Sequence, residues 1–399
     1  MIGPEPTVGR EYQMTFRPSR LKFGVFMAPL HHHAGDNPVL SFDEDIEFLA
    51  HLDRLDFDEA WIGEHHSGAV EVYADPALLI AAAAQRTRRI MLGTGVVDLP
   101  LHHPFMVADR MVMLDNLTRG RAMLGVGSGA LRADFTMIGR DINERSRMSG
   151  EAIDAIMALL RAERPVTMKT DWFELNDARI QIASYTKPHL PVAVAGTASA
   201  DGMPASGKHG IGLLSAARSG SMRETWERVE ASAAQHGRTV SRADWRVTKF
   251  CHIAETREEA LNDCRELFPR FSGAGLLGAV PDGTNDNILP ELAVERGGSI
   301  IGTPDDAIAA ITAAQEESGG FGGFLCAMYG VVKRDAMLRS YELLSRYVVP
   351  HFQGNFEVMK ANREWVLATG GGPTGPGPAR GPGTGIGYAT PPSGNGATG

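Results

Sequence analysis

Short apolar runs alternate along the chain with longer segments in which apolar residues recur at helical spacing. Residues 92–101 form one such run, which ends in a proline like a buried strand that stops at a cavity. Further on, Ile153, Ile156, Met157 and Leu160 follow the i, i+3, i+4, i+7 pattern of an amphipathic helix. Such alternation is typical of repeated βα units with right-handed crossovers. The predicted strands are residues 21–27, 59–63, 90–97, 121–126, 191–195, 212–215, 245–253 and 321–328.

Capping residues mark the starts of the intervening helices. Ser41 stands in capping-box spacing with Glu44, and Thr303 precedes a proline at the first position of another helix. Eight strands with helices between them, over about 330 residues, fit one large domain better than two. We therefore predict an α/β fold, a single (β/α)8 TIM barrel with insertions.

Composition divides the chain into four regions. The barrel is expected to contain a small hairpin at residues 166–182 and a glycine-rich, irregular excursion at residues 268–300, which suggests a functional loop or lid. The last thirty residues consist mostly of Gly, Pro, Thr and Ala, so this tail is expected to be disordered. The predicted regions are an N-terminal arm at 1–20, the barrel at 21–352, a C-terminal extension at 353–369 and the tail at 370–399.

The charge and the cysteine content limit the classes of partner and site that the protein is expected to have. Lys and Arg number 39 against 48 Asp and Glu, and the net charge of −9 argues against a nucleic-acid partner. Cys251, Cys264 and Cys326 lack the spacing of a zinc ribbon, and their odd number does not indicate a disulfide framework. No apolar run approaches the roughly 20 residues of a membrane span, and no signal peptide is evident. We expect a cytoplasmic protein with a small, weakly polar ligand and no membrane partner.

Three successive predicted strands are each followed directly by polar or glycine residues at their C-terminal ends. The second strand runs into Glu64, His65 and His66, the third ends before two further histidines, and the fourth runs into the glycine-rich segment 125–129. Parallel strands place their C-terminal ends on one rim, where the active sites of α/β barrels lie. The glycine-rich segment lacks the full spacing of a dinucleotide fingerprint, so a Rossmann site is not favoured.

Over about residues 21–352 the chain resembles the bacterial luciferase-like, flavin-dependent monooxygenases. The resemblance rests on the order and spacing of four motifs, at residues 60–66, 92–104, 113–121 and 301–304. Three segments are most similar to the limonene monooxygenases of that family, at residues 61–67, 93–97 and 251–258.

The resemblance implies an enzyme that binds reduced FMN at the C-terminal mouth of the barrel. A separate flavin reductase would supply the cofactor, which would react with O2 to give a C4a-hydroperoxyflavin and transfer one oxygen atom to an organic substrate. The protein would position the cofactor, exclude water and control a proton. A pocket rimmed by Met27, Leu30 and residues 268–300 would suit a small apolar substrate, such as a monoterpene like limonene. Members of the family also pair through early barrel helices, so a homodimer is expected.

Three residues are the catalytic candidates. In the family, the histidine that matches His65 acts as an acid or base beside the flavin, a task for which the pKa of imidazole is suited. His66 is its neighbour. Glu64 is expected to support the site, either by holding the ring of a neighbouring histidine or by pairing with a barrel arginine.

The flavin-binding candidates come from the ends of other strands. Gly95 and Val96 match the position of a non-prolyl cis peptide beneath the flavin ring in the family, and Gly127 lies in the loop beside the flavin. Ser128 stands where bacterial luciferase has a phosphate-binding arginine, which weakens its assignment to the phosphate. Backbone N–H groups and hydroxyls at a strand-to-helix junction offer a phosphate cradle at Gly196, Thr197, Ala198 and Ser199. Ala28, Thr94 and Ser215 are further flavin-side candidates at strand ends.

Three other functions stay open. The nearest is a deazaflavin (F420)-dependent oxidoreductase of the same superfamily. The histidines of the segment 31–33, with Asp36, would also suit the metal site of a metal-dependent hydrolase barrel. Predicted strands five, six and eight, however, end without further metal ligands. A flavin-binding protein without turnover would share every binding feature.

Overall fold

The computed structural model describes residues 16–28, 30–31, 37–68, 71–162, 164–196, 202–216, 222–268 and 289–369. These residues form two compact units, one ending at Gln353 and the other beginning at Gly354. The second unit contains one described helix, α14 (Asn355–Ala368). The predicted tail at 370–399 and most of the predicted N-terminal arm lie outside the described residues. No helix in the described ranges combines the length and apolarity needed to cross a membrane.

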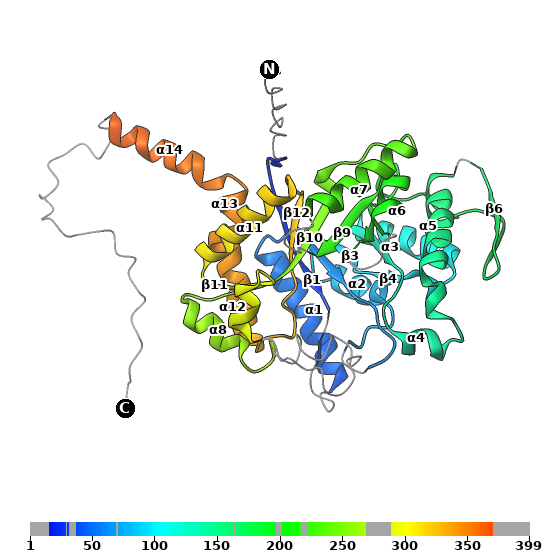
Figure 1. Cartoon of the computed structure of the whole chain (residues 1–399), viewed down its shortest axis with the longest axis horizontal. Helices are drawn as coiled ribbons and strands as arrows, with labels where there is room; N and C mark the ends of the chain where they lie inside the picture. Colours follow the sequence, from blue (N-terminus) through cyan, green and yellow to red (C-terminus); the bar gives the residue numbers. More distant parts are fainter. Residues whose placement is uncertain are drawn as a thin grey trace, which may run out of the picture. The chain divides into compact units, whose positions relative to one another are not determined.

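Eight parallel strands of the described chain close into a barrel, which confirms the predicted fold class (Figure 1). Each strand pairs with the next around the ring, and the last pairs with the first, so the barrel has no open edge. The strands, in order around the ring, are β1 (Lys22–Met27), β2 (Glu59–Ile62), β3 (Met91–Thr94), β5 (Ala122–Gly127), β8 (Val192–Ala195), β9 (Gly212–Ala216), β10 (Trp245–Ile253) and β12 (Gly323–Cys326).

Helices surround the barrel, and several begin at a capped position followed by proline. Asp75 accepts a hydrogen bond from the first turn of α2, and Thr303 forms a capping box with Asp306 at the start of α11. The prediction for Ser41 was wrong: Asn37 caps α1, because Pro38 supplies the first helical position three residues earlier. The helices include α1 (Pro38–Arg54), α2 (Pro76–Ala84), α3 (Pro104–Thr118), α4 (Arg132–Met137), α5 (Arg145–Arg161), α6 (Gly202–His209), α7 (Met222–Gln235), α8 (Arg257–Cys264), α11 (Pro304–Ser318), α12 (Arg334–Leu343) and α13 (Val349–Phe352).

The N-terminal half of the barrel interior is filled by side chains. Trp61 packs there in a small apolar cluster with Met123, Leu214 and others. A Cβ atom at Gly93 would lie 2.6 Å from the Trp61 ring, so glycine makes room for the indole. Beside it, Arg246 donates two hydrogen bonds of 2.7 Å to the buried Glu59 carboxylate. Burial opposes ionisation of Glu59, but the guanidinium outweighs it and holds the pKa at about 2. Open space is consequently left at the opposite, C-terminal end.

Two details differ from the predicted elements, and one further prediction is confirmed. The third predicted strand is interrupted after Thr94: the Gly95–Val96 peptide is cis, and β4 (Val97–Asp98) then pairs with β5. Part of the excursion at 268–300 is regular, since α10 (Pro290–Glu295) lies within it and β11 (Ser299–Gly302) begins in it, while residues 269–288 fall outside the described chain. β11 forms because β10 is nine residues long. The C-terminal part of β10, from Phe250 to Ile253, continues beyond the barrel and pairs with β11. The hairpin is confirmed as β6 (Val166–Lys169) and β7 (Glu174–Ala178).

Candidate active site

A cavity of about 560 Å³ lies at the C-terminal ends of the barrel strands. Its lining is largely apolar, with Phe26, Leu30 and Leu214 among the larger side chains. Leu30 lies where it was expected, but Met27 is fully buried in the core. Successive residues of a strand point to opposite faces, so Phe26 points into the barrel and Met27 outward toward the helices. The strand ends therefore enclose a pocket of the size and character of a cofactor or small-molecule site.

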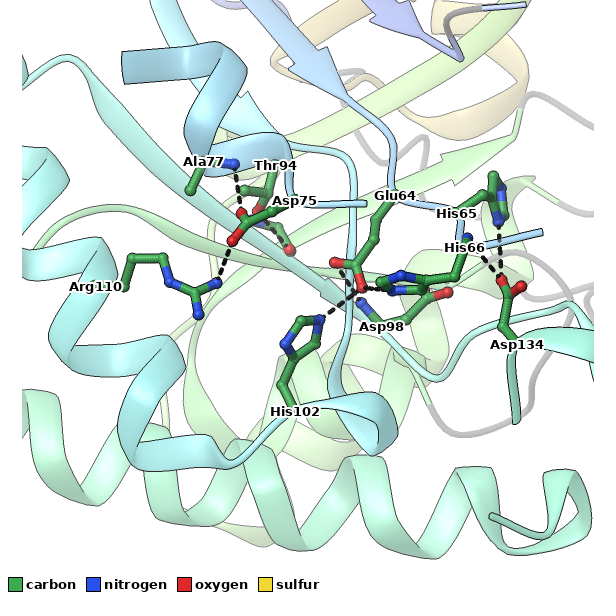
Figure 2. Close-up of polar contacts among 11 residues, drawn as sticks. Glu64, His65, His66, Asp75, Ala77, Thr94, Asp98, His102, Arg110 and Asp134 are labelled. Carbon is green, nitrogen blue, oxygen red and sulfur yellow. Dashed lines mark hydrogen bonds and ion pairs between the residues drawn. The ribbon is translucent and has the colours of Figure 1, made fainter. Parts of the chain in front are cut away.

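Glu64 joins two histidines from different parts of the rim. Its Oε1 atom lies 2.9 Å from Nε2 of His66 and 2.6 Å from Nε2 of His102, and both rings lie beside it in Figure 2. Burial opposes the charge of Glu64, but the hydrogen bonds from the two imidazoles lower its pKa. The same carboxylate raises the pKa of His66. Of the two partners expected for Glu64, the structure shows the histidine, because the barrel arginine Arg246 binds Glu59 instead.

His65 lines the cavity between two carboxyl groups. Its Nε2 atom is 3.3 Å from Oε2 of Glu71, and its Nδ1 atom is 3.7 Å from Oδ2 of Asp134. The backbone N–H of His65 donates a 2.9 Å hydrogen bond to the Tyr73 carbonyl, which holds this segment in place. Burial lowers the pKa of His65 despite the nearby Asp134 charge. A neutral imidazole in the wall of a cavity is able to accept or donate a proton near neutral pH.

Three buried carboxyl groups and one arginine were missed by the sequence reasoning. Glu71 and Asp98 line the cavity, Asp134 contacts both His65 and the backbone N–H of His66, and Arg145 lines the cavity from the start of α5. Burial raises the pKa of Glu71 to about 8 and that of Asp98 well above its usual range. A usable signal was present, since Glu71 and Asp98 each interrupt an apolar stretch next to a strand end.

Most of the predicted flavin-bed residues line this cavity. Ala28, Gly95, Val96, Gly127 and Ser128 all contribute to its wall. A Cβ atom at Gly127 would lie 2.5 Å from Cγ2 of Val96, so only glycine fits this approach of the two loops. Small residues thus keep one wall of the cavity free of side chains.

The other predicted flavin-binding residues, Thr94, Ser215 and Gly196, are held by hydrogen bonds to neighbouring barrel strands. Thr94 is buried between β3 and β5: its hydroxyl donates to the Gly125 carbonyl at 2.7 Å and accepts from the Gly125 N–H at 2.9 Å. Ser215 lines the cavity and accepts a 2.8 Å hydrogen bond from the Trp245 indole. The N–H of Gly196 donates to the Leu214 carbonyl, and Thr197, Ala198 and Ser199 lie outside the described residues.

A small side pocket adjoins Gly127 and Ser128. It is bordered by Ser146 and Ser149 of α5 and by Gly202 at the start of α6. The described part of the predicted phosphate cradle is close to this pocket, because Ala195, the residue before Gly196, also borders it. Hydroxyl and backbone N–H groups of this kind are suited to phosphate oxygens.

Two groups of described side chains have the spacing of metal ligands. Glu64, His66 and His102 form one, His65, Asp98 and Asp134 the other, and each group brings three ligand atoms within 4.8 Å of one another. The first group is already joined by hydrogen bonds. Neither group includes the histidines proposed for a hydrolase barrel: His31 is hydrogen-bonded to Asp45, and His32, His33 and Asp36 lie outside the described residues.

Comparison with known proteins decides the family of the chain. Residues 21–320 match the model of the luciferase-like monooxygenases. The chain belongs to this family. Over 358 residues it is 43% identical to a luciferase-like relative, the 4-hydroxyprotoasukamycin monooxygenase of Streptomyces nodosus subsp. asukaensis, with 87% of this chain and 96% of the relative covered. It is equally 43% identical, over 352 residues, to the limonene 1,2-monooxygenase of Rhodococcus erythropolis, with 84% and 88% covered.

A solved structure supports the same grouping. The oxygenating constituent of 3,6-diketocamphane monooxygenase from Pseudomonas putida, a type II Baeyer–Villiger monooxygenase in complex with FMN, superimposes with a TM-score of 0.69. Its sequence identity to this luciferase-like chain is 25%, and the match covers 83% of this chain and 98% of that one. The family and fold expected from the sequence motifs are therefore confirmed.

Proposed function

We propose that this luciferase-like protein is a flavin-dependent monooxygenase that uses reduced FMN and O2 to transfer one oxygen atom to a small apolar substrate. The observation that carries the proposal is the cavity at the barrel mouth, which combines an apolar lining, a glycine-rich wall and the buried imidazole of His65. Such a cavity is able to hold a flat cofactor next to an apolar substrate and to exclude water from both.

The residues present fit FMN. Gly95, Gly127 and Ala28 leave a wall without large side chains, against which an isoalloxazine ring would lie. Ser128 and the side pocket beneath it would receive the phosphate, with the guanidinium of Arg145 as the positive charge in the cavity wall. Reduced FMN, when bound, supplies the electrons that activate O2, and a separate flavin reductase would deliver it.

The chain itself would hold and move a proton in this site. His65 would act as the general acid or base, because it lines the cavity and its burial keeps the imidazole neutral at physiological pH. Glu64 and His66 would position this segment through the bonds that join β2 to His102.

The substrate would be a hydrocarbon with a double bond, and epoxidation would be the reaction. Phe26, Leu30, Leu214 and Val331 offer dispersion contacts but few hydrogen bonds, as a monoterpene such as limonene requires. The similarity to the limonene 1,2-monooxygenase of R. erythropolis supports this choice.

We further propose a cytoplasmic homodimer. Leu78 of α2 and Met106, Met113 and Leu117 of α3 are all more than half exposed, and these two helices pack together, so they offer an apolar surface for a second copy. The three cysteines are free and buried, which fits a reducing compartment.

Incubation of the purified protein with limonene, chemically reduced FMN and isotopically labelled O2 tests the proposal. We expect a product that carries one labelled oxygen atom, with mass spectrometry as the measurement. A parallel reaction with reduced F420 and no O2 separates the deazaflavin-dependent alternative. Absence of FMN binding in both redox states would contradict the proposed function outright.

A further inference from the structure

Four buried carboxyl groups surround the imidazole of His65 and its neighbours. Glu64, Glu71, Asp98 and Asp134 are all at most 4% exposed, and they come from three different segments of the rim. Figure 2 shows Glu64, Asp98 and Asp134 together with the three histidines near them. The site therefore concentrates acidic groups where water is largely excluded.

These carboxyl groups have few partners that would stabilise negative charge. Two imidazoles bind Glu64, whereas Glu71 and Asp134 share the single imidazole of His65. Oε1 of Glu71, Oδ2 of Asp98 and Oδ1 of Asp134 are buried without a hydrogen-bond partner among the described residues. Of the described residues that line the cavity, Arg145 alone carries a permanent positive charge, and its guanidinium donates to the Ile142 carbonyl. Four carboxylates without cations cannot all remain ionised in such surroundings, so some of them must hold protons.

Glu71 is the carboxyl group in direct reach of His65. Its Oε2 atom lies 3.3 Å from Nε2, while the other ring nitrogen, Nδ1, faces the Asp134 carboxylate at 3.7 Å. We propose that Glu71 is a neutral carboxylic acid in the resting protein and acts through His65, as a positioning residue that sets its tautomer and as its proton reserve.

The geometry explains both parts of this role. A protonated Glu71 donates from Oε2 toward Nε2, so the imidazole carries its own proton on Nδ1, where Asp134 attracts it. When His65 gives its Nδ1 proton to a group in the cavity, the Nδ1–H bond breaks. The O–H bond of Glu71 breaks at the same time and an N–H bond forms at Nε2, so the ring stays neutral as its Nε2–H tautomer. The net change is one proton moved from Glu71 to the cavity, with the negative charge left on Glu71 until solvent restores the proton. The catalytic part of this inference rests on the proposed function.

The ionisable groups around Glu71 carry both signs of charge. Glu64 and His66 lie on its own side of the rim, Asp98 on β4, Asp134 on α4 and Arg145 on α5, and Asp98 is itself raised in pKa by burial and by the charges of Glu64, Asp134 and Glu71. Burial alone raises the pKa of Glu71 to about 8. Above that pH the proton reserve is lost.

Two substitutions separate positioning from proton storage. Glu71→Gln keeps the size of the side chain and a donor toward Nε2 but holds no labile proton, and Glu71→Ala removes both. Nitrogen NMR of labelled His65 in the flavin-free protein should show the Nδ1–H tautomer in the wild type and in Glu71→Gln, and a mixture of tautomers in Glu71→Ala. The infrared difference between wild type and Glu71→Gln should isolate a protonated-carboxyl component that disappears with a midpoint near pH 8, because any band of the protonated Asp98 is common to both proteins and cancels.

Several results would overturn the inference. These are an unchanged carboxyl band in Glu71→Gln, an unchanged His65 tautomer in Glu71→Ala, or stoichiometric binding of Zn²⁺ by His65, Asp98 and Asp134, which would mean that a cation rather than protons neutralises the cluster. Binding of oxidised FMN to each variant is measured separately by calorimetry. Since the spectra are recorded without flavin, their failure leaves the proposed monooxygenase function standing, and loss of FMN binding in the wild type leaves the proton inference standing.

Discussion

The Glu64 carboxylate and the His102 imidazole, 38 residues apart in the chain, are joined by a 2.6 Å hydrogen bond. It links the end of β2 to the segment that follows β4. His66 binds the same carboxylate oxygen, so one acidic group holds two imidazoles beside the cavity. This arrangement makes Glu64 a structural support of the rim, and its removal has a predictable pH dependence.

Glu64→Gln should lower the free energy of unfolding by about 1 kcal/mol, because two hydrogen bonds lose the added strength of a charged acceptor. Glu64 has a lowered pKa, so its contribution is present above its ordinary value of 4.5. His66 has a raised pKa, so its contribution is complete below its ordinary value of 6.5 and is lost as the pH rises through the raised value. Urea unfolding of the wild type and of Glu64→Gln at several pH values measures how the stability difference between them depends on pH. A difference that is constant from acid to alkaline pH would contradict it.

His65→Ala should retain FMN binding but lose about 100-fold in the rate of oxygen transfer, with more hydrogen peroxide released per product formed. The physical reason is the loss of the imidazole that controls a proton at the cavity wall. Product and peroxide are quantified in the same reaction. His351→Ala, at an exposed histidine outside the cavity lining, is the matched control. Unchanged coupling of oxygen transfer in His65→Ala would remove this residue from the mechanism.

Gly127→Ala should weaken FMN binding by about 1–3 kcal/mol, because the new methyl group collides with Val96 in the wall of the cavity. Fluorescence titration measures the dissociation constant, and circular dichroism checks the fold. The double variant Gly127→Ala/Val96→Ala restores space and should recover much of the affinity. If it binds FMN as weakly as the single variant, the contact with Val96 is not the cause.

Arg246→Met should destabilise the protein by about 3–5 kcal/mol, because Glu59 is then left buried without its guanidinium partner. The pKa of Glu59 is about 2, so the stabilisation from its charge is present above pH 4.5 and is lost as the pH falls through 2. Chemical denaturation at neutral pH measures the loss. The double variant Glu59→Leu/Arg246→Met removes both charges and should regain most of it. An equal loss in both variants would mean that packing dominates.

Met113→Lys should convert the proposed dimer to a monomer, because a charge would be placed in the exposed apolar surface of α3. Light scattering coupled to size-exclusion chromatography measures the mass. Met359→Lys, at a methionine of α14 that is 70% exposed, provides the control and should leave the mass unchanged. A monomeric wild type would refute the proposed assembly directly.

Local patterns in the sequence were sufficient to predict the barrel, and the resemblance to the luciferase-like family predicted much of the cavity wall. Strand and helix periodicities are properties of neighbouring residues, and they placed all eight barrel strands within a few positions of the observed ones. Gly95 and Gly127 were assigned by their position in the family, and the structure gives the physical reason for glycine there, since close approaches exclude a Cβ atom. The α10 and β11 segments were not predicted because each is short and lies in glycine-rich surroundings. β11 also depends on pairing with the C-terminal part of β10, which is distant in the sequence.

The chemistry of His65 could not be predicted in the same way. Glu71 and Asp98 each interrupt an apolar stretch, which hints at burial, but nothing in the sequence shows that they lie beside Asp134 and His65. Closure of the barrel brings them together and buries them away from cations. Desolvation and mutual repulsion depend on distances through space rather than along the chain, so the protonation of this cluster is set only when the fold is complete.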